Sequence, residues 1–125
     1  MDIATAKRAA TLTSAEFQIL IALVDVERHG YGIMQEVGRA TEDAVRLAPG
    51  TLYRSIKRLL SDGLIEESDD RPAPEDDDER RRYYRLTAHG RAVAEAEARR
   101  LQRLVRVAQQ KHLLPAPAIV RREGS

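Results

Sequence analysis

A run of cationic and hydroxyl side chains between Pro49 and Gly63 carries the clearest potential chemistry in the sequence. Proline is favoured in the first helical turn and glycine just beyond the last, so these two residues bound one expected helix. Its cations and hydroxyls, which could meet phosphates and base edges, are Thr51, Arg54, Ser55, Lys57 and Arg58. Apolar residues at helical spacing define the other side: Leu52, Ile56, Leu59 and Leu60. The pattern indicates a recognition helix, and the alternative for this helix taken alone is a solvated face on an ordinary core helix.

Two earlier segments would position this helix. Thr13 and Glu16 match a capping box, in which each residue caps the other's backbone N–H, so a helix should begin there and run through the apolar residues 17–26. A second helix is expected from Tyr31 to Val37, after a break at Gly30. Two helices followed by a turn and a basic amphipathic helix is the helix-turn-helix order.

Two short strands are expected directly after the basic helix, over residues 64–68 and 82–87. The long loop between them makes the pair a β-wing, so the sequence predicts a mainly α fold with a small two-stranded β-wing. Arg80, Arg81 and Arg82 lie where the loop returns, and they could contact a nucleic-acid backbone or neutralise neighbouring acids. The loop itself is strongly acidic, so we do not expect residues 76–79 to touch DNA, and they could instead fold onto the arginines.

A long final helix is expected from Ala88 to His112 because the segment is rich in Ala, Glu, Arg and Leu. Its apolar positions form a heptad-like seam, Ala94, Ala98, Leu101, Val105 and Ala108, which Leu104 and Val107 widen. The small core that precedes it cannot cover such a stripe along its whole length. We therefore expect the helix to meet the same helix, or the first one with Phe17, in a second subunit.

Charge is distributed unevenly along the 125 residues. Residues 66–79 hold nine acidic side chains and one arginine, which leaves 20 Lys or Arg against 11 Asp or Glu elsewhere. A basic body attracts polyanions. There is no cysteine, and the longest apolar run, residues 19–24, is too short to span a bilayer, so a cytoplasmic protein with no membrane partner is expected.

No catalytic constellation is assembled in the sequence. The three histidines, His29, His89 and His112, lie on separate segments, and the acids at 76–79 lack the alternating spacing of a calcium loop. We expect neither an enzyme nor a metal site nor a cofactor. A different class of protein, a winged-helix module that binds another protein, stays open, although its third helix should then carry apolar anchors instead of cations.

Four blocks in order resemble the PadR family of bacterial transcriptional regulators, in its short form. They are residues 29–33 (HGYGI), 49–54 (PGTLYR), 59–65 (LLSDGLI) and 82–87 (RYYRLT) with Gly90. The resemblance implies a homodimer that binds a pseudo-palindromic operator in double-stranded DNA, usually as a repressor. It also implies that the third helix enters the major groove and that tyrosines at the positions of Tyr31 and Tyr53 contact phosphates.

The resulting domain organisation has four parts: a flexible arm (1–12), the winged helix-turn-helix domain (13–87), a C-terminal dimerisation helix (88–114) and a flexible tail (115–125). Dimers of this shape can enclose a cleft for a small-molecule inducer, but Phe17 is the only phenylalanine and there is no tryptophan, which disfavours a flat aromatic ligand. One departure from the family pattern is Ala48, which stands where many relatives carry a serine. The basic helix therefore loses a side-chain cap worth about 1 kcal/mol, for which Thr51 could partly compensate.

Overall fold

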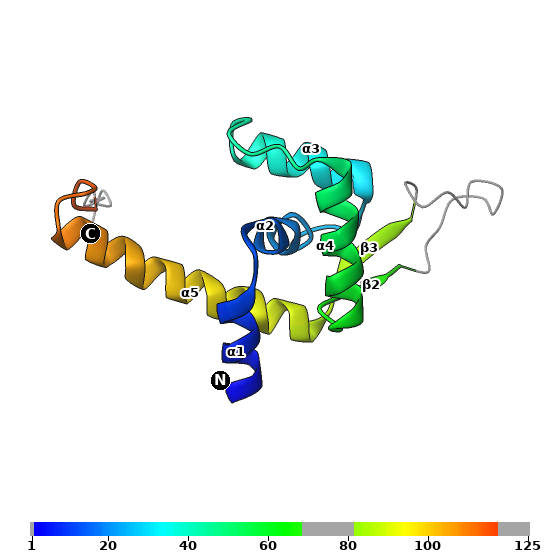
Figure 1. The fold of residues 1–125 in the computed structure, drawn as a ribbon, viewed down its shortest axis with the longest axis horizontal. Helices are drawn as coiled ribbons and strands as arrows, with labels where there is room; N and C mark the ends of the chain where they lie inside the picture. The colour runs from blue at the N-terminus through cyan, green and yellow to red at the C-terminus, as the bar shows by residue number, and fades with distance from the viewer. Residues whose placement is uncertain (1, 69–81, 118–125) are drawn as a thin grey trace, which may run out of the picture.

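The computed structural model describes residues 2–68 and 82–117. The described chain is mainly helical, and a small antiparallel sheet lies beside the fourth helix (Figure 1). The elements follow one another as α1 (Ile3–Thr11), α2 (Ser14–Ala22), β1 (Arg28–His29), α3 (Gly30–Ala40), α4 (Pro49–Ser61), β2 (Ile65–Glu67), β3 (Tyr83–Leu86) and α5 (Ala88–Gln110). The predicted winged helix-turn-helix architecture with a long final helix is confirmed.

The helix-turn-helix is built from α2, α3 and α4 around the centre of α2. The capping box is present in full, because Thr13 Oγ1 accepts from the Glu16 N–H and the Glu16 carboxylate accepts from the Thr13 N–H. Ile19 and Leu20 are completely buried between the other helices. The helix ends at Ala22, four residues earlier than predicted, and the Arg28 guanidinium donates to the freed Ala22 carbonyl at 2.8 Å.

The first residues fold into a helix, contrary to the flexible arm predicted for residues 1–12. Asp2 caps α1 by accepting from the Thr5 N–H at 2.7 Å, and this hydrogen bond holds the pKa of Asp2 below its usual value. Thr5 and Ala9 are buried where α1 packs against α5. The sequence indicated at most a short helical turn here, because the segment has no long apolar period. A helix this short depends on packing against another element, which α5 supplies.

Within the described residues, the sheet has three strands in the order β1, β3, β2, one more than predicted. β1 pairs with β3 through Arg28 opposite Tyr84, and β2 pairs with β3 through Glu66 opposite Arg85. A strand of two residues has no alternation to read in a sequence, which is why β1 was not expected. Residues 69–81, which hold most of the acidic loop, Arg80 and Arg81, lie outside the described residues.

The end of α4 and the start of α5 meet at β2. Gly63 takes a left-handed φ of 72° as α4 ends, which confirms its predicted role. The Thr87 hydroxyl caps α5 by accepting from the Gly90 N–H and donates to the Gly63 carbonyl. A Cβ on Gly90 would lie 1.9 Å from the Leu64 carbonyl oxygen, so only glycine permits this close approach of helix and strand.

The two halves of α5 differ in burial. Val93, Ala94 and Ala96 belong to the core in the first half. In the second half, Leu104 and Val105 are 53% and 44% exposed, and Figure 1 shows this part of the helix extending away from the other elements. Only part of the predicted seam is therefore covered by its own chain. Of the flexible tail predicted for 115–125, residues 118–125 lie outside the described residues.

Candidate nucleic-acid interface

The candidate recognition helix α4 is bound to the core by one side only. Leu52, Ile56 and Leu59 are buried, and Arg54 and Lys57 on the remaining surface are exposed. Pro49 begins the helix, and Ala48 supplies no side-chain cap, as the sequence predicted. Thr51 does not replace that cap: its hydroxyl accepts from the Arg54 guanidinium at 3.5 Å instead. The start of α4 therefore presents backbone N–H groups and cations together, which favours anions.

A groove of about 430 Å³ lies between α4 and the sheet. Cations line it from both sides, with Arg54 and Lys57 on α4 and Arg82 just before β3. Its floor includes Tyr84, which is buried, and Ile56. Within the described residues, Arg54 and Lys57 form no ion pair that would neutralise them. The groove thus combines cationic walls with the beginning of α4.

The two tyrosines assigned to phosphates sit in different environments. Tyr31 is 59% exposed near the beginning of α3, where its ring stacks on His29 with the centroids 6.4 Å apart. Tyr53 is half-buried and packs over Gly30, since a Cβ there would lie 2.8 Å from the Tyr53 hydroxyl oxygen. Tyr31 is therefore the more accessible of the two, and Gly30 fixes where the Tyr53 ring lies.

His29 has a structural role at the same place. Its Nδ1 accepts from the Gly32 N–H at 2.8 Å and so caps α3, and its ring packs edge-on against Tyr83.

No group of three or more His, Asp or Glu residues in 2–68 and 82–117 is arranged to hold a metal ion. Across the same ranges, no helix is long and apolar enough to cross a membrane.

Arg82 is the one described member of the predicted arginine triplet. Its side chain is half-buried, and its guanidinium lies 3.5 Å from the Glu67 carboxylate on β2. Of the two alternatives for this triplet, the contact agrees with neutralisation of neighbouring acids, while the position beside the groove keeps Arg82 near any anion bound there.

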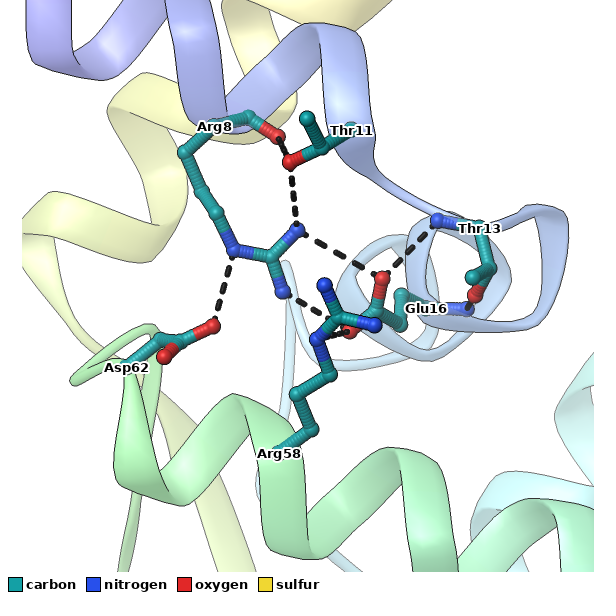
Figure 2. A network of polar contacts seen from close by, with 6 residues as sticks. All are labelled: Arg8, Thr11, Thr13, Glu16, Arg58 and Asp62. Atoms are coloured by element: carbon teal, nitrogen blue, oxygen red, sulfur yellow. Dashed lines mark hydrogen bonds and ion pairs between the residues drawn. The ribbon is translucent and has the colours of Figure 1, made fainter.

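A charged cluster at the other end of α4 was not foreseen from the sequence (Figure 2). The Glu16 side chain, only 1% exposed, lies 2.7 Å from Arg8 on α1 and 3.6 Å from Arg58 on α4. Arg8 also donates to Asp62, the residue that ends α4, at 2.9 Å. We call Arg8, Glu16, Arg58 and Asp62 the α4-end cluster. It joins α1, α2 and α4 through charged hydrogen bonds.

Opposing effects act on the ionisation of Glu16. Burial by itself would raise its pKa, but hydrogen bonds from Arg8 and Thr13, together with the charges of Arg8 and Arg58, hold the pKa below its usual 4.5. Burial likewise disfavours the Arg8 cation, and its two carboxylate partners raise its pKa overall. Both groups are therefore charged at neutral pH. Arg58, which the sequence assigned to a phosphate, forms an ion pair with Glu16.

The residues predicted for the dimer interface fall into two groups. Phe17 is partly buried against the core, and Ala94 is buried within its own chain, so Ala94 presents little surface to a second subunit. The remaining predicted positions stay exposed or half-buried along the second half of α5: Ala98, Leu101, Leu104, Val105 and Ala108.

Comparisons with known proteins agree with this arrangement. The profile of the "Transcriptional regulator PadR-like family" matches residues 19–96. The transcriptional regulator Rv3488 of Mycobacterium tuberculosis is 38% identical over 93 residues, which cover 74% of this chain and 80% of that protein.

Solved structures resemble the fold over most of its length. A PadR family transcription regulator from Clostridium difficile superposes with a TM-score of 0.66 at 26% identity, covering 80% of this chain and 99% of the other. A transcriptional regulator from Clostridium thermocellum gives a TM-score of 0.66 at 22% identity, covering 82% and 93% of the two chains, and this likeness concerns the fold alone. The resemblance inferred from the four sequence blocks is thereby confirmed, and the chain belongs to the PadR-like family of DNA-binding transcriptional regulators.

Proposed function

We propose that this protein is a homodimeric repressor that binds a pseudo-palindromic operator, with the start of α4 from each copy in the major groove. The observation that supports it most is the exposed pair Arg54 and Lys57 beside the groove between α4 and the sheet, which forms no ion pair with any residue that the structure describes. Two-fold symmetry then requires half-sites about one or two helical turns apart.

The proposed DNA-binding side chains fall into base contacts and phosphate contacts, according to where each one lies. Arg54, Thr51 and Ser55 lie in the first two turns of α4, where a recognition helix meets base edges, and a guanidinium is suited to bidentate contact with guanine. Lys57 and the exposed Tyr31 are suited to phosphates, which fix register without reading sequence. The further phosphate contacts in the proposal are Tyr53, Arg58, Arg80, Arg81 and Arg82.

The second half of α5 supports the dimer. Leu104, Val105 and Val107 are each more than 40% exposed on a helix about 35 Å long, and clustered apolar side chains of this size favour association. A second copy of the same helix would cover them through a self-complementary contact. The protein would act in the cytoplasm without enzymatic activity, and a small-molecule inducer remains a further candidate partner.

Selection of bound fragments from a random duplex pool, followed by titration over a range of salt concentrations, tests the proposal. A symmetric consensus should emerge, and log K should fall with log salt by about 0.9 for each phosphate neutralised. A winged-helix module that binds protein would instead give no consensus and no salt-dependent duplex binding.

Repression needs a separate readout. The protein should lower transcription from a promoter that overlaps the selected operator, and it should leave a promoter with a scrambled operator unaffected. An increase in transcription from the intact promoter would identify an activator and contradict the proposed repressor role.

A further inference from the structure

The α4-end cluster adds a connection between α4 and α5 to those that the rest of the fold supplies. α2 packs against both helices, and the Thr87 hydroxyl at the start of α5 donates to the Gly63 carbonyl just after α4. The cluster provides a separate route through α1, which packs against α5, because the Arg8 guanidinium on α1 reaches Asp62 at the end of α4. Figure 2 shows this guanidinium between the two carboxylates, from α2 and from the end of α4.

We propose that Arg8, Glu16 and Asp62 are positioning residues for operator binding, which set the placement of α4 relative to α5 through α1. The inference rests on the proposed function, in which α4 enters DNA and α5 pairs the two copies. The distance between the two recognition helices then depends on how each α4 is held to its own α5. A loosened cluster would let that distance vary, which matters only when both half-sites are engaged.

The geometry suits a positioning role. Glu16 is almost fully buried and accepts from Arg8 on α1 and from the Thr13 N–H that begins its own helix, so its location is fixed, and the Arg8 side chain is only 14% exposed. Charged hydrogen bonds at 2.7 and 2.9 Å from one guanidinium to two carboxylates are directional, which fixes angles as well as distances. Apolar packing alone restrains sliding and rotation less tightly.

Charge and positioning make opposite predictions for Asp62. Removal of an acid near a polyanion should tighten binding to every duplex, if charge alone matters. Loss of the Arg8 hydrogen bond should weaken binding to the paired operator, if positioning matters. Asp62→Asn therefore separates the two explanations by the sign of its effect, and the partly exposed side chain makes the substitution mild for folding.

The experiment titrates the full chain with two duplexes, one carrying the selected operator and one in which a single half-site is scrambled. Asp62→Asn and Arg8→Met are the test variants. Their matched controls are Asp25→Asn, whose side chain is 76% exposed outside the cluster, and Lys7→Met, whose exposed cation on α1 forms no ion pair within the described residues. Thermal unfolding and sedimentation show whether each variant is folded and dimeric during the titration.

Both test variants should lose about tenfold in affinity for the paired operator and less than about twofold for the single half-site, while the controls change the two affinities alike. Tighter or unchanged paired binding by Asp62→Asn would overturn the positioning role, as would equal losses on both duplexes. Failure of the wild-type protein to prefer the paired operator would overturn the proposed function, and this inference with it.

Discussion

The two ends of α4 carry similar side chains in opposite settings. Toward the groove, in the second and third turns, Arg54 and Lys57 are exposed. Toward its end, Arg58 is also exposed but pairs with the buried Glu16, and Asp62 accepts from Arg8 in the α4-end cluster. The difference shows that cations on one helix face do not share one role, because neighbouring elements decide which of them can meet a ligand.

Glu16→Gln, in the α4-end cluster, should produce the largest change, which is a loss of folding stability. Loss of the buried charge leaves Arg8 and Arg58 without their shared partner, which should lower the free energy of unfolding by about 2 to 4 kcal/mol. Urea titration at neutral pH measures it. Glu95→Gln, on the exposed side of α5, is the matched control and should change stability by less than about 0.5 kcal/mol. A similarly small change for Glu16→Gln would mean that the cluster does not stabilise the fold.

Arg54→Ala, beside the groove, should weaken operator binding and leave folding stability nearly unchanged. Loss of a bidentate base contact should weaken operator binding by about 1 to 3 kcal/mol and relax the preference at one position. Titration with the operator and with single-base variants measures both effects. Arg103→Ala, exposed on α5, is the control, and equal affinities for Arg54→Ala and wild type would remove Arg54 from the interface.

Lys57→Ala should have a smaller and less selective effect. A lost phosphate contact weakens binding to all duplexes alike and reduces the salt slope by about 0.9. The slope is measured with the operator and with an unrelated duplex. A loss confined to the operator would instead assign Lys57 to a base.

Ala48→Ser should modestly stabilise the beginning of α4. A serine before Pro49 can accept from an early N–H of α4, which should add about 0.5 to 1 kcal/mol to the free energy of unfolding. Urea titration measures the gain, with Ala48→Gly as a comparison. No gain would mean that the N–H groups at this end are already satisfied in another way.

The stability that the α4-end cluster supplies should also depend on pH, because it rests on the same Glu16 charge as the first prediction. Because the pKa of folded Glu16 lies below its usual 4.5, its charge adds stability above that pH, and the added stability is lost as the pH falls through the folded pKa. The difference in unfolding free energy between wild type and Glu16→Gln should therefore shrink below pH 4.5. A difference that grows on acidification would contradict the assigned cause.

The sequence predicted the elements that carry local signals. Pro49 and Gly63 marked α4, Thr13 and Glu16 marked the start of α2, and the apolar spacing identified which side of α4 is buried. Such signals act within one or two helical turns, so a single sequence displays them.

The features that were missed depend on partners distant in the chain. α1 is held by α5, β1 by β3, and the Arg8 and Asp62 pair joins residues 54 positions apart. Glu16 was recognised as half of a capping box, but nothing in its spacing indicated that two arginines would also reach it. Ala94 fitted the seam, yet it is covered by its own core because the first half of α5 packs there.

Targeted DNA cleavage tests most directly whether the start of α4 enters duplex DNA in two copies. The chain has no cysteine, and among the described residues no neighbouring atom lies within 4 Å of a Cβ built on Gly50, so Gly50→Cys can carry an iron chelate at the beginning of α4. Two symmetric cleavage sites about one or two helical turns apart are expected on the operator, and none from a chelate at the exposed Gln110→Cys. Bound operator that stays uncut by the chelate at position 50 would contradict the entry of α4 into duplex DNA.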